Sequence, residues 1–198
     1  MKNFLHVGCG PQTKWNIQKG FNSEQWREVR FDIDAAVKPD IVGAMTDMSL
    51  VATGSMDALY SSHNIEHIFA HEVPIALREF HRVLNPEGFV VITCPDLQTV
   101  CEAVAHDKLL ESLYVSASGP IAAIDILFGH RASMAGGNQH MAHKCGFTYS
   151  TLQVAFLEAG FASMIGGRRL AGFDLWLLAY RTSRSEEFLR ETGPIYLP

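Results

Sequence analysis

The chain is predicted to be an α/β protein with a parallel, doubly wound sheet, and three observations predict this class. Residues 3–8 form a short strand pattern that ends in a glycine-rich turn. Residues 89–93 (FVVIT) form a continuous apolar run, which suits a strand buried on both faces. A helical stripe precedes that run, and strand–helix–strand alternation of this kind indicates parallel strands.

Four strands are expected before the apolar run. They are residues 3–8, 28–33 (EVRFDI), 40–43 (DIVG) and 56–61 (MDALYS). Val73, Leu77, Phe80 and Leu84 then recur at helical spacing, and Pro74 suits the first turn of that helix. Asn85-Pro-Glu-Gly is a turn sequence that ends it.

The second half of the chain is expected to complete one domain over residues 1–182. Residues 107–146 are rich in Gly, Ser and His and are interpreted as a cap or lid insertion. A helix is expected from about Ser150 to Ala159, with Ser150 and Gln153 as its capping box. The remaining segments are a strand pair and a loosely ordered tail, at residues 161–167, 173–181 and 183–198.

Composition limits the partners and the compartment. The 198 residues carry a net charge of −5, which argues against a nucleic-acid backbone as the main partner, although Arg168 and Arg169 could form a local basic patch. No apolar run is long enough to span a membrane. The four cysteines lack disulfide-like spacing, so reduced thiols in the cytoplasm are expected.

A glycine turn and a spaced acid predict a nucleoside-binding site. Glycines in Leu5-His6-Val7-Gly8-Cys9-Gly10 let the backbone turn sharply and approach a ligand closely. Asp32 stands 22 residues after Gly10, at the end of the next strand. A carboxylate there can accept hydrogen bonds from both ribose hydroxyls of an adenosine-type ligand, and Asp34 could do the same. A plain βα turn with a solvated acid is the alternative.

The residues after the glycine turn favour a ligand without phosphates. Gly10 is followed by Pro-Gln-Thr-Lys-Trp, so the third glycine of a dinucleotide fingerprint is missing. A pyrophosphate site needs a helix N-terminus supported by that glycine. This disfavours a nicotinamide oxidoreductase.

Five blocks of sequence resemble, in order, the class I S-adenosylmethionine-dependent methyltransferases of the type-11 kind, in particular the small bacterial predicted ones. The blocks are LHVGCG, FDID, MDALYSSHNIEHI, LNPEGFVVITCPDL and FTYSTLQVAFLEAGF. The resemblance implies a Rossmann-like methyltransferase fold with a seven-stranded, mostly parallel sheet and a terminal antiparallel hairpin. It also implies S-adenosylmethionine as the cofactor.

The resemblance carries site residues over by position. It implies that Gly8 and Gly10 face the methionine part of the cofactor, that Asp32 holds the ribose, and that Ser62 and His63 lie beside the sulfonium. Such families often bind the adenine amino group with an acid after the third strand, where this chain has Ala44, so Asp47 or the backbone at Met45 would have to replace it. The expected cofactor-binding residues are Gly8, Cys9, Gly10, Asp32, Asp34, Met45, Asp47, Ser62 and His63.

The histidines allow a metal alternative, but no metal is expected. His63-Asn-Ile-Glu66-His67 matches H-x-x-E-H, a zinc-protease motif that belongs on a helix, whereas His63 directly follows a predicted strand. Glu66 and His67 are therefore interpreted as residues that hydrogen-bond locally and fix the loop. Zinc hydrolysis remains a remote alternative.

A second histidine cluster is expected to line the acceptor pocket. His140, His143 and Cys145 are too closely spaced for a structural zinc finger. The resemblance places this segment over the cofactor's methyl, so His143 and His140 are candidate general bases, with His63 as a third catalytic candidate. Loop histidines without a chemical role are the alternative.

The predicted function is methyl transfer to an oxygen or carbon atom of a small-molecule or glycan acceptor. Ser61-Ser-His-Asn64 follows the fourth strand where the amino-methylating nucleic-acid enzymes carry an Asn/Asp-Pro-Pro-Tyr element, which argues against that class. The alternative from another class is a protein that binds the cofactor without transferring methyl, as a sensor or partner subunit.

Overall fold

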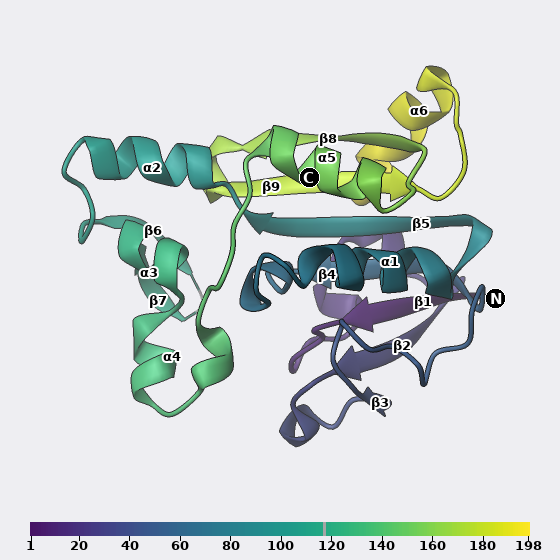
Figure 1. Ribbon diagram of the computed structural model, residues 1–198, viewed down its shortest axis with the longest axis horizontal. Helices are drawn as coiled ribbons and strands as arrows, with labels where there is room; N and C mark the ends of the chain where they lie inside the picture. The colour runs from purple at the N-terminus through teal and green to yellow at the C-terminus, as the bar shows by residue number, and fades with distance from the viewer. Residues whose placement is uncertain (117) are drawn as a thin grey trace.

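A seven-stranded sheet forms the centre of the molecule (Figure 1), as the computed structural model of residues 1–116 and 118–198 shows. The strands lie in the order β3-β2-β1-β4-β5-β9-β8. They are β1 (Lys2–Val7), β2 (Trp26–Asp32), β3 (Ile41–Val42), β4 (Met56–Ser62), β5 (Leu84–Pro95), β8 (Ser163–Arg169) and β9 (Asp174–Tyr180). The first five strands are parallel, and β9 pairs antiparallel with both β5 and β8. The predicted mostly parallel sheet with a terminal antiparallel hairpin is confirmed.

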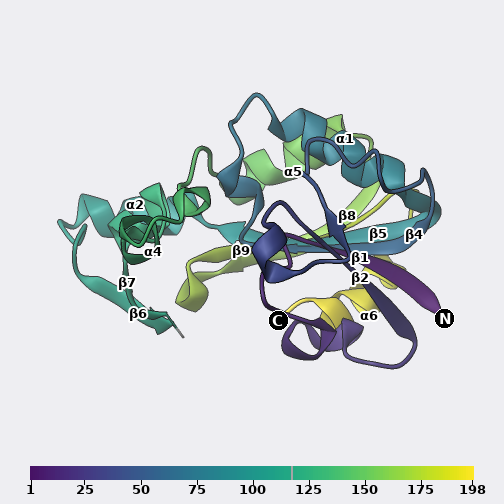
Figure 2. The same cartoon turned by 90° about the horizontal axis from the view of Figure 1, so that it is seen from below.

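Both faces of the sheet are covered (Figure 2). Helices α1 (Val73–Val83) and α5 (Tyr149–Glu158) lie on one face, and α6 (Glu186–Tyr196) lies on the other with two 3-10 turns, η1 (Lys14–Asn16) and η2 (Lys19–Phe21). Side chains alternate between two apolar clusters along β1, with Leu5 in the first and Phe4 in the second. This two-sided burial explains the continuous apolar run in β5.

Helix α1 begins where the sequence predicts but ends one residue before the expected Leu84. Pro74 occupies its first turn, and the buried side chains follow the helical repeat. They are Val73, Ala76, Leu77, Phe80 and Val83. Leu84, expected in the helix, instead takes an extended conformation, pairs with Met56 of β4 and begins β5. Asn85-Pro-Glu-Gly therefore lies within β5, and the prediction that it ends the helix is wrong.

The start of α5 differs from the prediction. Thr148 has an extended backbone, and its hydroxyl accepts a hydrogen bond from the Thr151 amide at 3.4 Å, so Thr148 is the N-cap. Ser150 is already helical, and the expected capping box with Gln153 is wrong. Gly160 follows the helix with φ of 99°, the left-handed conformation expected there.

The C-terminal segment differs more. Residues 186–196, placed in a loosely ordered tail by the sequence analysis, form α6, which Ser185 caps by accepting from the Phe188 amide at 3.2 Å. No α-helix follows the glycine turn in residues 8–25, all of which are described, so one sheet face lacks the helix of a usual crossover. The ring of Tyr196 packs there, 5.2 Å from Phe21 and 4.7 Å from Phe89 between centroids.

The expected cap lies beyond the ends of the parallel strands, on the side toward which β1, β2 and β5 point in Figure 1. It begins before the expected residue 107, because α2 (Leu97–Ala105) packs against it through Val100. Its elements are α2, β6 (Ser112–Ser116), β7 (Gly119–Ala122), α3 (Ala123–Phe128), α4 (Arg131–Ala135) and η5 (Gln139–Met141). Residue 117, within this insertion, lies outside the described residues. The cap has a small apolar cluster of its own, around Val100, Ile121 and Ile126. Its position agrees with a lid, and that role remains a prediction.

Candidate cofactor and acceptor site

The predicted site lies where the parallel strands end, a region we call the carboxyl end of the sheet. Val7 at the end of β1 pairs with Phe31 on one side and with Ser61 on the other. The loops that follow these strands therefore meet. Of the predicted residues, this brings together Gly8, Cys9, Gly10, Asp32, Asp34, Ser62 and His63.

The two glycines of the turn have different surroundings. Both have positive φ, 67° at Gly8 and 50° at Gly10, which favours glycine. A Cβ on Gly8 would lie 2.3 Å from Cγ of Asn64, whereas a Cβ on Gly10 would meet nothing within 4 Å. Asn64 therefore fills the space over Gly8, and the open space lies over Gly10. Cys9 between them has its side chain in the core.

The structure separates the two candidate acids. The Asp32 carboxylate accepts from the Gly10 amide through Oδ2 at 2.8 Å and from the Asp34 amide through Oδ1 at 2.9 Å. A carboxylate has about four acceptor positions, so two remain for a ligand. The Asp34 carboxylate instead accepts from the Ala36 amide and caps a 3-10 turn, η3 (Ala35–Val37).

Residues of β2 hold the glycine turn in place. Glu28 accepts from the Lys14 amide at 2.9 Å and contacts the His6 ring at 2.7 Å. The Arg30 guanidinium donates to the carbonyl oxygens of Gly10 and Lys38. The turn is thus fixed before any ligand arrives.

Sequence reasoning missed Ile33, which is 55% exposed although it directly follows Asp32. A large apolar side chain exposed beside an acid with free acceptor positions is a candidate surface for a flat apolar ring. The signal was present in the sequence as one apolar residue between two acids, in FDID.

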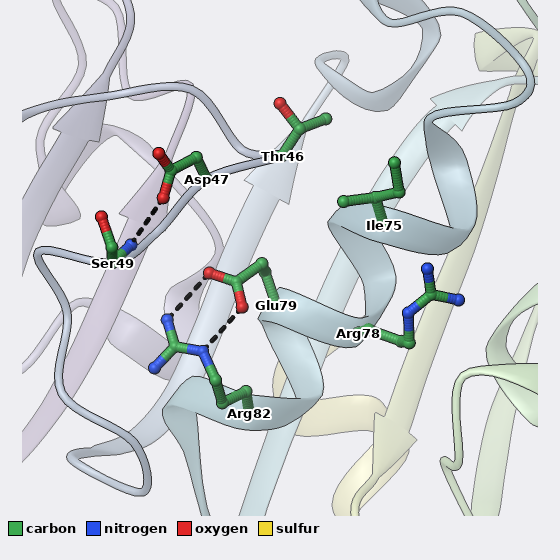
Figure 3. A pocket seen from close by; sticks show the side chains of 7 residues that line it. All are labelled: Thr46, Asp47, Ser49, Ile75, Arg78, Glu79 and Arg82. Carbon is green, nitrogen blue, oxygen red and sulfur yellow. Dashed lines mark hydrogen bonds and ion pairs between the residues drawn. The ribbon is translucent and has the colours of Figure 1, made fainter.

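The structure places Asp47 beside α1. Its carboxylate accepts from the Ser49 amide at 3.1 Å, and the loop lines a cavity of about 500 Å³ with Arg78, Glu79 and Arg82 of that helix (Figure 3). Met45 packs its side chain into the core and offers only its backbone. A role for Met45 and Asp47 toward the cofactor remains a prediction.

His63 has a strained backbone and two acidic neighbours. Its φ is 48°, and its ring nitrogens lie 3.6 Å from Glu66 Oε1 and 3.9 Å from Asp174 Oδ2. Desolvation acts to lower the pKa of His63, but the carboxylates of Asp174 and Glu66 outweigh it and raise that pKa to about 9. His63 is therefore a cation at neutral pH.

The adjacent arginines do not form a free basic patch. Arg168 Nε donates to Asp96 Oδ2 at 2.7 Å, and Arg169 Nε donates to Asp174 Oδ1 at 2.9 Å. Both aspartates are buried, so each arginine charge is offset locally. The two arginines therefore do not form the local basic patch that the sequence analysis left open.

His143 reaches the carboxyl end of the sheet, and His140 does not join it there. The Lys144 and Cys145 amides donate to the Glu66 carbonyl oxygen at 2.8 and 3.3 Å, which ties the end of the cap to the turn after β4. His143 thereby stands with Glu66 and His67, whereas His140 is exposed on η5. The H-x-x-E-H motif lies on a 3-10 turn, η4 (Ile65–His67), so the histidine row of a zinc-protease helix does not form.

Comparison with known proteins agrees with this geometry. A family profile described as "Methyltransferase domain" matches residues 5–92, from β1 to the middle of β5. This profile is that of the type-11 methyltransferases, so the family likeness covers residues 5–92, 88 of the 198 residues of the chain. S-adenosylmethionine is the cofactor of this domain, and the open space over Gly10 with the two free acceptor positions of Asp32 fits its adenosine. No curated protein sequence matches the chain significantly.

Solved structures share the fold of this methyltransferase domain at low identity. A S-adenosylmethionine-dependent methyltransferase from Methanosarcina mazei is 12% identical, with 92% of this chain and 93% of that chain covered and a TM-score of 0.59. A possible histamine N-methyltransferase from Thermotoga maritima is 11% identical, with coverages of 92% and 83% and a TM-score of 0.54. The citrinin polyketide synthase CMeT domain is 11% identical, with a TM-score of 0.55. The alignment covers 92% of this chain but only 47% of that structure.

These likenesses show the fold, and none of them transfers an acceptor to this chain. The chain covers 47% of the CMeT structure, and it covers 62% of a further structure, a possible exported protein from Bordetella parapertussis (14% identical, TM-score 0.56). It therefore spans about half to two thirds of these two proteins. Among the described residues, no helix is long and apolar enough to cross a membrane.

Proposed function

We propose that this protein transfers a methyl group from S-adenosylmethionine to an oxygen or carbon atom of a small-molecule or glycan acceptor. The observation that carries the proposal is Asp32, which bridges the Gly10 and Asp34 amides and keeps two acceptor positions for a ribose. Cys9, Cys94, Cys101 and Cys145 are all free thiols, which supports the cytoplasm as the compartment.

The glycine turn supports a nucleoside over a dinucleotide. A pyrophosphate binds where a helix N-terminus presents free amides and a positive dipole end. Residues 8–25 contain only the short turns η1 and η2, so no α-helix begins directly after Gly8 and Gly10 to present such a terminus. A sulfonium cofactor has no phosphate, so its site does not need a helix N-terminus.

In the proposed complex, each residue type has a separate task. Asp32 accepts hydrogen bonds from the ribose hydroxyls, and Ile33 packs on the apolar face of the adenine. Ser62 and His63 stand at the end of β4, nearest the reacting end of the cofactor. We propose that the cap closes over this end and excludes water.

When bound, S-adenosylmethionine supplies an electrophilic methyl group. The protein must align the acceptor with it and, for a hydroxyl acceptor, remove a proton. Desolvation lowers the pKa of His143 below its usual value, so its ring is neutral at pH 7. His143 Nδ1 lies 2.7 Å from the Ile126 carbonyl oxygen, which leaves Nε2 unprotonated. Among the three candidates His143 therefore suits proton removal best, because His63 is cationic and His140 is exposed.

Titration calorimetry with S-adenosylmethionine, its demethylated product and NAD tests the cofactor proposal. Wild type should bind the first two and bind NAD far more weakly. Asp32→Asn keeps the shape of the side chain and removes its charge, so binding should weaken by about 1.5–3 kcal/mol, the worth of charge-assisted hydrogen bonds.

Asp34→Asn is the matched control, because its carboxylate caps η3, and it should change the affinity much less. Comparable affinity for NAD, or an Asp32→Asn protein that binds like wild type, would contradict the proposal. Release of the demethylated product in a screen of hydroxylated acceptors would then separate an enzyme from a protein that only binds the cofactor.

A further inference from the structure

We propose that Glu66, His67 and His143 form a binding site for a divalent cation of the zinc class. Each residue offers one ligand atom, and these atoms all lie within 4.8 Å of one another. Two of the three residues come from the turn after β4, and the third comes from the end of the cap. Only the folded chain brings them together.

The Glu66 side chain has no hydrogen bond to account for its burial. It is 1% exposed, and neither carboxylate oxygen has a hydrogen-bond partner. The nearest charge is His63, whose Nδ1 lies 3.6 Å from Oε1, longer than a hydrogen bond. The ion pair with His63 offsets part of the Glu66 charge, but a buried carboxylate without a hydrogen bond on either oxygen is still costly. A cation between Glu66 and the two histidines would satisfy it.

Both histidines are oriented as metal ligands. The His67 Nδ1 lies 3.1 Å from the Ala142 carbonyl oxygen, and the His143 Nδ1 lies 2.7 Å from the Ile126 carbonyl oxygen. A carbonyl oxygen can only accept, so in each neutral ring the proton is on Nδ1 and the lone pair is on Nε2. A hydrogen bond from the distal ring nitrogen is the arrangement that fixes histidine ligands in metal sites.

The backbone around the three side chains is rigid. The Glu66 carbonyl oxygen accepts from the Lys144 and Cys145 amides, so the two segments are joined on either side of the cluster. The His67 and His143 ring centroids are 4.9 Å apart. The site is thus assembled without a ligand.

The donor set selects the type of cation. Two imidazole nitrogens and one carboxylate oxygen suit zinc, whereas magnesium prefers oxygen ligands throughout. Ligands about 2.0–2.2 Å from tetrahedral zinc lie about 3.4 Å apart. The three atoms lie within 4.8 Å of one another, so binding would require them to approach by at most about 1.4 Å. Three protein ligands leave a fourth position for water or a substrate oxygen.

A cation here would deepen the proposed function, on which its chemical role depends. A hydroxyl of the acceptor at the fourth position would lose its proton more readily, because a bound cation stabilises the resulting oxygen anion. His143 would then act as a ligand and not as the base. The sequence analysis expects no metal, and the cluster with His143 is what leads us to propose one.

Metal binding can be tested without any acceptor. The full-length protein is treated with chelator, titrated with zinc, and analysed for metal content after gel filtration, and its thermal unfolding is followed with zinc or magnesium. We expect one zinc per chain and a higher melting temperature with zinc but not with magnesium, since binding to the folded state alone stabilises it. Cobalt should give visible bands of a four- or five-coordinate site.

Glu66→Gln and His143→Ala should each weaken zinc binding by about 100-fold or more, since even neighbours of metal ligands are worth 10–100-fold. The matched controls are His71→Ala and His140→Ala, exposed histidines of the same two segments. Circular dichroism establishes that each variant is folded. Zinc bound equally by wild type and Glu66→Gln, or no zinc bound by wild type, overturns the site.

Calorimetry with S-adenosylmethionine on the chelator-treated and the zinc-loaded wild-type protein keeps the two proposals separate. Cofactor binding without zinc binding refutes the metal site alone. Zinc binding without cofactor binding refutes the proposed function alone.

Discussion

Single residues at the glycine turn illustrate how similar sequence positions take different roles. Gly8 and Gly10 both have positive φ, and both were expected to face the cofactor. The neighbourhood differs, because the Asn64 side chain occupies the space over Gly8 alone. The need for glycine at position 8 is therefore partly a packing requirement inside the protein.

Alanine substitutions should separate these roles. Gly10→Ala should destabilise the protein by about 1 kcal/mol, from backbone strain alone, and Gly8→Ala by about 2 kcal/mol or more, because Asn64 must also move. Urea unfolding measures both. The double variant Gly8→Ala/Asn64→Ala should recover most of the difference, and equal costs for the two single variants would show that Asn64 is not the obstacle.

At the scale of elements, α6 replaces a missing helix. The connection between β1 and β2 has only 3-10 turns, and the C-terminal helix covers the face that a crossover helix would cover. Tyr196 anchors it against Phe21 and Phe89. The mostly polar C-terminal segment is thus held on the sheet by a few apolar side chains of α6.

Tyr196→Ala should destabilise the protein by about 1–3 kcal/mol, since it removes a large side chain from an aromatic cluster. Ile195→Ala is the control on the neighbouring residue, which is 53% exposed, and should change stability by at most about 0.5 kcal/mol. Thermal unfolding compares the two. Equal effects would mean that α6 does not depend on this ring.

The cap is held by an ion pair that should respond to pH. The Asp125 carboxylate accepts from Arg131 Nε at 2.7 Å and from a terminal guanidinium nitrogen at 3.1 Å. Arg131, against the opposing effect of burial, lowers the pKa of Asp125 from 3.8 to about 2. A carboxyl whose pKa is lower in the folded state stabilises the fold above its unfolded pKa, and this is lost as pH falls through the folded value.

Wild-type stability should therefore fall between pH 4 and pH 2 in part because of Asp125. Asp125→Asn should be less stable than wild type at pH 7, and the difference should shrink toward pH 2. Urea unfolding across this range measures it, with Asp107→Asn, an exposed aspartate of the cap, as the control. A difference that does not change with pH would show that the pair is unimportant.

At the scale of the whole molecule, the turns after β1, β2 and β4 meet at the carboxyl end of the sheet. The end of the cap is hydrogen-bonded to the turn after β4 there. A ligand bound there should stabilise these segments together, because exchange through local opening slows when the closed state is favoured. α6 lies on a face of the sheet, where it packs on the later part of the β1–β2 connection at Phe21 and not on the glycine turn itself.

Hydrogen–deuterium exchange should show this pattern. S-adenosylmethionine should slow exchange in residues 8–13 and 32–34 and in the end of the cap, while α6 stays unchanged. NAD at the same concentration should have little effect. Protection confined to the turns, with none in residues 140–146, would show that the cap does not close over the cofactor.

The sequence by itself determined what depends on short-range physics. Alternating and continuous apolar runs located the strands, helical spacing located α1, and glycines with a spaced acid located the cofactor turn. These features follow from backbone geometry and from which face a side chain occupies. They predicted the α/β class and an adenosine-type ligand, and the resemblance of the ordered blocks added the seven-stranded sheet and S-adenosylmethionine.

Only the tertiary structure decided which residues far apart in sequence meet. It showed Asp32 and not Asp34 bridging the turn, Asn64 over Gly8, and Asp47 beside α1. It also joined His143 to Glu66 and His67. Long-range contacts depend on how the whole chain packs, and no local pattern contains that information.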